Sequence, residues 1–238
     1  METPPPTPPT PPVTPVTSLD DPRALQILST EHWSLLTSRS LAYNEAFIRG
    51  GMFLTFLSTS FVALALLAQA MSFGDEFLTI AAIILAFDLA IGLATFGRIA
   101  GANEDDLRAL HGMARIRHGY TQIAPIVTPY FTTATHDDVA SVIAGYGSLP
   151  ATTGGSMLYG LTTSGGMIGL IVSMVGGVLA AVLALLAGAS GAAPMWLGFA
   201  GGVLVLAALF AWALVRIPRT QASLAVRFPS PDDGSAGE

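Results

Sequence analysis

Asp88 is the residue with the clearest chemical potential, because it is the one charged side chain in the stretch "IILAFDLAIGLA" from Ile83 to Ala94. A charged aspartate at the centre of a bilayer costs roughly 2.5 to 3.5 kcal/mol. A buried carboxyl avoids that cost by staying protonated. We therefore expect Asp88 to be protonated at rest and to form a polar contact between helices. The alternative is a proton or cation site that lines a pore or cavity.

The hydroxyl residues Ser58, Thr59 and Ser60 are the expected partners of Asp88. They form the most polar run of the preceding apolar stretch, and they lie about as far before the loop Ser72–Glu76 as Asp88 lies after it. With a rise of about 1.5 Å per residue, two antiparallel helices bring these positions to the same depth. The sequence therefore predicts an intramembrane polar site made of these four residues.

A second set, His111, Arg115 and His118, shares one face of a helix predicted from Glu104 to His118. Imidazole and guanidinium groups can bind an anionic lipid headgroup or a phosphate, and a free histidine titrates near pH ~6.5. Cations in the last turn also complement the helix dipole. We expect a solvated face, and the alternative is an anion or lipid headgroup site.

The trio His136, Asp137 and Asp138 resembles a metal-binding cluster in composition. However, Thr135 is a good N-cap, acidic residues suit the first helical turn, and Gly145 can end the helix. Adjacent residues on a helix do not face each other. We therefore predict a capped helix here and no metal site.

Several kinds of chemistry are excluded by composition. The chain has no Cys, and its ten basic residues are all Arg, so thiolate chemistry and lysine-based phosphate loops are absent. No zinc-protease, nucleophile-elbow or dinucleotide-binding motif occurs. With a net charge of −6, a nucleic-acid partner is not expected. We therefore predict a non-enzymatic protein without a cofactor or metal.

The elements that position these residues are four apolar stretches. The chain is 52% hydrophobic and only 11% charged, whereas soluble domains carry about 25% charged residues. Each stretch has the roughly 20 residues that a membrane helix needs. Short loops join them into two hairpins: Met52–Met71 with Phe77–Phe96, and Met167–Leu186 with Met195–Val215.

The arginines predict the orientation of these hairpins. None of the ten arginines lies in either hairpin loop, 72–76 or 187–194. The positive-inside rule therefore places both termini and the middle segment in the cytoplasm. The composition, rich in Ala, Gly and Pro and with Arg as its basic residue, also fits a high-GC bacterial gene. We expect an all-α, multi-pass protein of the bacterial inner membrane.

Cytoplasmic helices are expected before and between the hairpins. Asp21 and Pro22 predict a short helix, and a second helix is predicted to start near Thr30. The second helix carries an apolar stripe, which we expect to pack within the chain; the alternative is a neighbouring subunit. The stripe consists of Trp33, Leu36, Ser40, Tyr43 and Phe47.

The resulting organisation has six parts. The first is a Pro/Thr-rich tail without packed structure, which lacks the features of a signal peptide. The predicted parts are the tail (1–17), cytoplasmic helices (18–47), the first hairpin (48–97), a cytoplasmic helical segment with a Gly-rich linker (98–165), the second hairpin (166–216) and a cytoplasmic tail (217–238).

The third apolar stretch carries small residues at every fourth position, namely Gly165, Gly169, Ser173 and Gly177. Such stripes let helix backbones approach closely. The pattern predicts tight helix packing but leaves open whether the partner lies in the same chain or in a second copy.

The segments "LSTEHWSLLTSRSLAYNEAFIRGGMF" and "GMARIRHGYTQIAPIVTPYFTTATHDD" resemble a family of uncharacterised bacterial integral membrane proteins. The likeness covers roughly residues 28–138 and implies no catalytic residue. The plan of a cytoplasmic helix, two spans and further helices is also similar to the two-span effector domains of bacterial nucleotide-triggered defence systems.

Together these features favour a membrane scaffold or sensor subunit that acts through helix packing and cytoplasmic contacts. The alternative is a channel or pore-forming effector in which Asp88 is an intramembrane proton or cation site. The expected partner is the lipid bilayer. A second copy and a cytoplasmic protein are the open alternatives for a protein partner.

Overall fold

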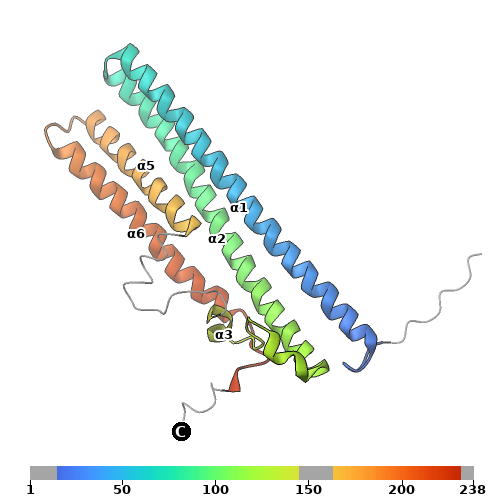
Figure 1. Ribbon diagram of the computed structural model, residues 1–238. Coiled ribbons are helices and arrows are strands. Elements are labelled where there is room, and N and C mark those ends of the chain that lie inside the picture. The colour runs from blue at the N-terminus through green and yellow to red at the C-terminus, as the bar shows by residue number, and fades with distance from the viewer. Residues whose placement is uncertain (1–14, 145–162, 232–238) are drawn as a thin grey trace, which may run out of the picture.

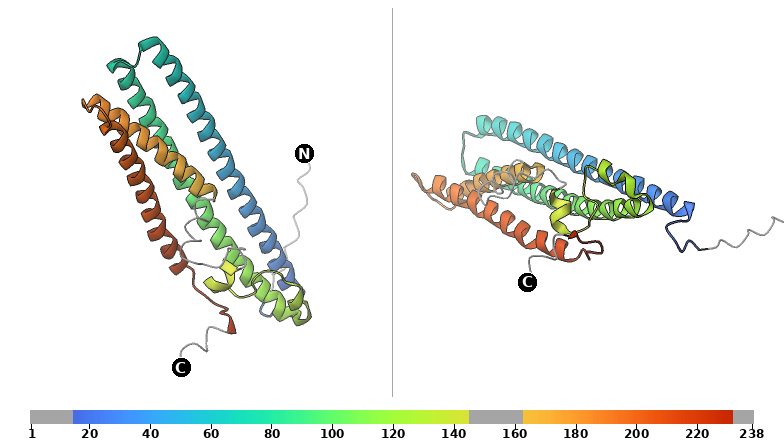
Figure 2. Two further views of the ribbon diagram at one scale, coloured as in Figure 1. Left: turned by 60° about the vertical axis from the view of Figure 1, so that its left-hand side comes forward. Right: turned by 60° about the horizontal axis from the view of Figure 1, so that its bottom comes forward.

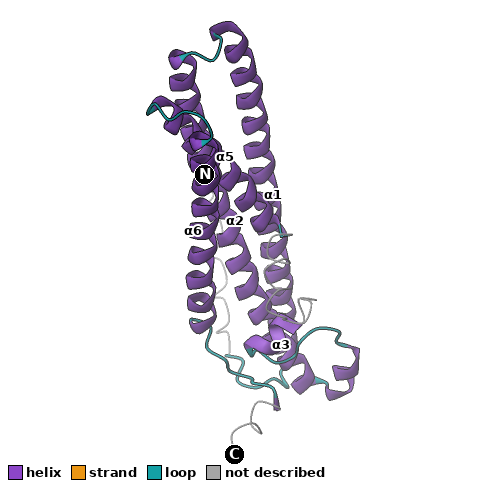
Figure 3. Cartoon of the chain, turned by 90° about the vertical axis from the view of Figure 1, so that its left-hand side faces the viewer, coloured by secondary structure: helices purple, strands orange, loops and turns teal. Residues whose placement is uncertain are grey.

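The computed structural model describes residues 15–144 and 163–231, and in these ranges the chain is helical without strands (Figure 3). Residues 1–14 of the predicted tail and most of the predicted Gly-rich linker lie outside the described residues. Four helices, α1, α2, α5 and α6, are long and apolar enough to cross a membrane. The elements are α1 (Pro22–Met71), α2 (Asp75–Ile123), η1 (Pro125–Tyr130), α3 (Val139–Ala144), α5 (Ser164–Leu186) and α6 (Ala193–Ala222).

Helices α1 and α2 lie side by side as two long antiparallel rods (Figure 1). A short turn at residues 72–74 joins them, with Ser72 and Phe73 at φ values of 53° and 56°. Each rod buries a stripe of residues at three- and four-residue spacing, as expected for helices that pack along one face. In α2 this stripe is Phe77, Ala81, Leu85, Asp88, Gly92, Thr95, Ile99, Ala102, Asp106, Ala109 and Met113.

The two rods are continuous, so the predicted helix starts near Thr30 and at Glu104 are wrong. Helix α1 runs through Thr30, whose hydroxyl donates to the carbonyl of Gln26 at 2.8 Å. Helix α2 likewise continues through Glu104 and past His118, which was the predicted end. Residues that favour caps are tolerated in a helix interior when the helix packs along its whole length.

Helix α2 is the central helix, with α1 on one side and α5 on another, and α6 packs mainly on α5 (Figures 1 and 2). Helix α5 runs antiparallel to α2, since Gly165 lies near Ile99 whereas Gly176 lies near Leu89. The turn between α1 and α2 and the loop between α5 and α6 lie at the same end of the bundle (Figure 1).

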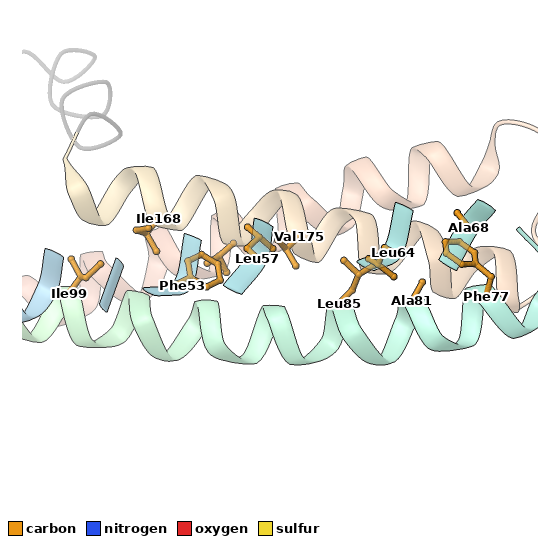
Figure 4. Close-up of a cluster of buried hydrophobic side chains, with 11 residues drawn as sticks. Phe53, Leu57, Leu64, Ala68, Phe77, Ala81, Leu85, Ile99, Ile168 and Val175 are labelled. Atoms are coloured by element: carbon orange, nitrogen blue, oxygen red, sulfur yellow. The ribbon is translucent and has the colours of Figure 1, made fainter. Parts of the chain in front are cut away.

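The apolar core lies where α1, α2 and α5 meet (Figure 4). Gly92 allows this contact, because a Cβ there would lie 2.7 Å from Val172 Cγ2 and 3.0 Å from Phe53 Cζ. Leu85 and Gly92, about one turn before and after Asp88 on α2, both contact this core. Its larger members are Phe53, Leu57, Leu64, Phe77, Leu85, Ile99, Ile168, Val172 and Val175.

The opposite faces of the long helices expose large apolar side chains, among them Phe56 on α1, Phe87 on α2 and Phe199 on α6. A soluble monomer rarely exposes apolar surface of this extent. The exposed apolar faces are therefore consistent with a bundle whose outer surface contacts lipid.

Candidate functional site

Asp88 on α2 is completely buried, with 0% of its surface exposed, and it faces α1. Its Oδ1 accepts a hydrogen bond from Ser60 Oγ at 2.9 Å. No described residue offers a hydrogen-bond partner to Oδ2. Protonation of Oδ2 would leave Oδ1 free to accept from Ser60, so the geometry accommodates a neutral carboxyl.

Of the three predicted partners of Asp88, the structure brings only Ser60 to it. Ser58 and Thr59 are exposed, and their hydroxyls donate to the carbonyls of Leu54 and Thr55 at 2.8 Å and 3.0 Å. Successive helical residues point in directions about 100° apart. The depth argument therefore identified the correct run, Ser58 to Ser60. The rotation of α1 about its axis decides that only Ser60 of this run faces Asp88.

A second buried carboxylate on α2, Asp106, was missed by the sequence reasoning. Arg39 on α1 donates to it through Nε and, at 3.3 Å, through Nη2, and the Tyr43 hydroxyl donates at 3.0 Å. The sequence does predict that Asp106 lies on the same face of α2 as Asp88, because it follows Asp88 by 18 positions. That is five turns of 3.6 residues, so both point toward α1.

His111 and Arg115 are brought together by α2, but around an anion that the chain itself supplies. Arg115 Nε lies 2.6 Å from Asp137 Oδ2, and its Nη2 donates to the carbonyl of Ala225. His111 is buried, with Nδ1 3.9 Å from the same carboxylate oxygen. The expectation of a solvated face is therefore wrong for His111.

The C-terminal segment, residues 223–231, covers this part of α2. Asp137 accepts from the backbone N–H groups of Arg227 and Phe228, the latter at 2.6 Å. The ring of Phe228 stacks on His118, with centroids 4.3 Å apart and planes inclined by 21°. We call Arg115, His118, Asp137 and Phe228 the C-terminal latch.

Asp137, a member of the latch, and His111, which lies beside it, have shifted pKa values. Burial by itself would raise the pKa of Asp137, but Arg115 and the backbone N–H groups of Phe228 and Arg227 hold it below its ordinary value. Burial lowers the pKa of His111; Asp137 opposes that shift, and Arg115 adds to it. At neutral pH the latch thus joins an ionised aspartate to an arginine, beside a neutral histidine.

The third predicted set separates into different roles. Asp137 belongs to the latch, whereas Asp138 accepts from the backbone N–H of Ser141 at 2.8 Å, the contact of an N-cap. Helix α3 begins at Val139, so the cap is Asp138 and not the predicted Thr135.

The small residues of α5 find their partners within the same chain. A Cβ at Gly177 would lie 2.8 Å from the carbonyl oxygen of Gly198 on α6, and the Gly202 position faces the carbonyl of Ser173. Gly165 and Gly169 face α2, at Ile99 and Phe96 respectively. Close backbone packing therefore joins α5 to α6, and side-chain packing joins it to α2.

Of the predicted apolar stripe of α1, Tyr43 contacts α2 through Asp106, whereas Trp33, Leu36, Ser40 and Phe47 are exposed. The residues that face α2 are offset by about one position and include His32, Leu35 and Arg39. As a result, Trp33 and Phe47 are each 66% exposed. The expected intramolecular packing of these residues is therefore wrong.

No family model, curated protein or solved structure matches the chain. The resemblance to a bacterial membrane protein family therefore gains no support from these comparisons. The structure itself gives the broad class: an all-helical chain with four helices long and apolar enough to span a membrane.

Proposed function

We propose that the chain is a non-enzymatic scaffold or sensor subunit of a bacterial inner membrane. In this proposal α1 with α2 and α5 with α6 form two membrane hairpins, and both termini are cytoplasmic. The cytoplasmic half of α1 binds a protein partner through an exposed apolar stripe, defined as Trp33, Leu36 and Phe47. The exposure of this stripe is the observation that carries the proposal.

The distribution of charge supports this topology. Both hairpin turns lie at one end of the bundle (Figure 2), and no arginine occurs in them. Several arginines instead form ion pairs beyond the spans, such as Arg39 with Asp106 and Arg216 with Glu104. Arginine accumulates on the cytoplasmic side of membrane proteins.

The length and continuity of α1 support a partner-binding role. From Pro22 to Gly50 the helix extends about 40 Å before the predicted span. The Arg39–Asp106 ion pair fixes this part of α1 to α2. A rigid rod with large apolar side chains on its outer face is a typical protein-binding surface.

The burial of Asp88 favours the scaffold over the alternative channel. A residue that lines a conduction path contacts water or an ion. Asp88 instead has no exposed surface and is held by Ser60 within one copy of the chain. A structural contact between helices accounts for this geometry.

The exposed stripe is tested by the double variant Trp33→Ala/Phe47→Ala in membranes of the producing cells. We expect the native complex to become smaller on blue-native gels, because the apolar contact is lost. The matched control is Ser34→Ala/Ser38→Ala, which changes exposed polar positions of the same rod. An unchanged complex in the first variant would contradict the proposal.

Topology and conduction are tested separately. Because the chain has no Cys, Glu76→Cys and Ser38→Cys each introduce one thiol, and a membrane-impermeant maleimide should label only the first in spheroplasts. Reconstituted wild-type protein should not conduct protons or cations. Ion flux that Asp88→Asn abolishes would establish the channel instead.

A further inference from the structure

A groove of about 900 Å³ lies between α1 and α2, outside the sites described above. One end contains the charged residues Glu45 and Arg49, beside Leu41, Asn44 and Ile48. Arg98 on α2 is next to this end, because its guanidinium pairs with Glu45. The other end is apolar and is lined mainly by Met52, Phe56 and Ile91. The groove is thus amphipathic along its length.

The charged end carries one net positive charge. Glu45 bridges the two arginines, with 2.9 Å to Arg49 Nε and 2.8 Å to Arg98 Nη2. Hydrogen bonds from Arg98 and Arg49 lower the pKa of Glu45 to about 2, so the carboxylate is ionised at physiological pH. The described contact of Arg49 uses only Nε, which leaves its Nη groups available to a second anion.

The residues that line the apolar end offer an occupant no free hydrogen-bonding side chain. Thr95 also lines it, but its hydroxyl already donates to the carbonyl of Ile91 at 2.8 Å. Met52 and Phe56 are exposed. This surface suits a hydrocarbon chain.

The two ends lie on opposite sides of the predicted membrane boundary. Arg49 precedes the span that begins at Met52, and Arg98 follows the span that ends at Phe96. The charged end is therefore at headgroup level, and the apolar end is at the level of the acyl chains.

We propose that this groove binds an anionic phospholipid, with its phosphate on Arg49 and Arg98 and one acyl chain along Met52, Phe56 and Ile91. The inference rests on the membrane placement in the proposed function but not on the scaffold role. It moves the lipid headgroup site away from the His111, Arg115 and His118 face.

Charge complementarity favours a lipid over a second copy of the chain. A second copy would have to bring an unpaired acidic side chain to this level. The described acids nearest to it in the sequence already have partners: Glu45 pairs with Arg49 and Arg98, Glu104 with Arg216, and Asp105 with Arg108.

Native mass spectrometry of the full chain in detergent tests the site, with equal amounts of phosphatidylglycerol and phosphatidylcholine added. We expect wild-type protein to retain phosphatidylglycerol preferentially. Arg98→Gln should lower that preference about fivefold, because one cationic contact is lost. Glu45→Gln should raise it, because the phosphate no longer competes with the carboxylate.

The opposite signs separate a binding role from a structural one. Both substitutions break the same ion pair, so a merely structural role would shift lipid retention in the same direction for both. Arg108→Gln is the matched control, since Arg108 lies on α2 in another exposed ion pair. Arg49→Gln is the second variant if Arg98→Gln loses its helical circular dichroism spectrum.

Three results would overturn the site: no preference for phosphatidylglycerol, equal changes in both variants, or a dimer that Arg98→Gln dissociates. The dimer would identify a second copy as the occupant. Failure of the topology test at Glu76 and Ser38 would instead refute the membrane arrangement. The lipid-binding proposal and the membrane topology can therefore be refuted separately.

Discussion

Asp88 and Asp106 are two buried carboxylates on the same face of the same helix, with different partners. Both point from α2 toward α1. Asp106 lies beyond the predicted span and contacts Arg39 and Tyr43. Asp88 lies within the span, and the one hydrogen bond to its side chain from the described residues comes from the hydroxyl of Ser60.

The difference extends to the two halves of the bundle. The half beyond the spans is joined by ion pairs, including those of Arg39 and Arg115. The spanning half is joined by apolar side chains and by glycine contacts such as that of Gly177 with Gly198. A charge is stable where an arginine or water can reach it, whereas a lipid-facing segment relies on close packing.

The largest effect should come from Arg39→Met, which removes the guanidinium that donates to the buried carboxylate of Asp106. Removing one member of a buried pair costs about 3 to 5 kcal/mol, and we expect about 3 because Tyr43 still donates. Unfolding in mixed detergent micelles measures this loss. Arg108→Met, in an exposed pair, should change little. If Arg39→Met lost as little stability as Arg108→Met, the Arg39–Asp106 ion pair would not be needed to stabilise the buried carboxylate.

Gly177→Ala tests the packing of the spanning half. The new methyl group would lie 2.8 Å from the backbone oxygen of Gly198, so α5 and α6 must separate. We expect a loss of about 1 to 3 kcal/mol in the same unfolding assay. Gly97→Ala is the control, because no atom lies within 4 Å of the added carbon. A stable Gly177→Ala protein would show that the close approach is dispensable.

The stability of the protein should depend on pH through His111, which lies outside the spans beside Asp137 of the C-terminal latch. Burial lowers the pKa of His111, so the unfolded chain binds a proton first as the pH falls below about 6.5. Stability should therefore decrease from pH 7.5 to 5.5, by about 1.4 kcal/mol at most. His111→Leu should reduce the decrease, whereas the control His136→Gln should retain it. The same pH dependence in both variants would rule out His111 as the cause.

The smallest effects should come from the Asp88 contact. If Asp88 is neutral, Ser60→Ala removes one hydrogen bond, worth about 0.6 kcal/mol in a membrane protein. Asp88→Asn should be similarly mild, because it keeps the shape of the carboxyl. A loss from Ser60→Ala as large as that from Arg39→Met would show that Asp88 is charged, and would remove the contrast with Asp106.

The Asp88 site could be predicted closely because it depends on depth, and depth follows from counting residues on either side of a turn. The Ser60 contact lies where that count placed it. Asp106 was not found because its partner, Arg39, lies 67 positions away. Pairing them requires the rotation of both helices about their axes.

The exposed stripe on α1 shows why rotation cannot be taken from apolar periodicity alone. Trp33 and Phe47 form a regular pattern, which indicates a helix but not the face that packs on α2. In the structure Trp33 and Phe47 point away from α2, whereas His32, Leu35 and Arg39 contact it. Polar residues can occupy the packed face because Asp106 supplies a partner for Arg39.

By itself, the sequence determined that the chain is helical and has four segments able to span a membrane, because length and composition decide those properties. The residue count on either side of the first turn also predicted that Asp88 and Ser60 lie at the same depth. Only the tertiary structure decided which residues meet at a given depth, and that Asp137 binds the C-terminal segment against Arg115. Such contacts depend on helix rotation and on chain segments distant in sequence, which local patterns do not encode.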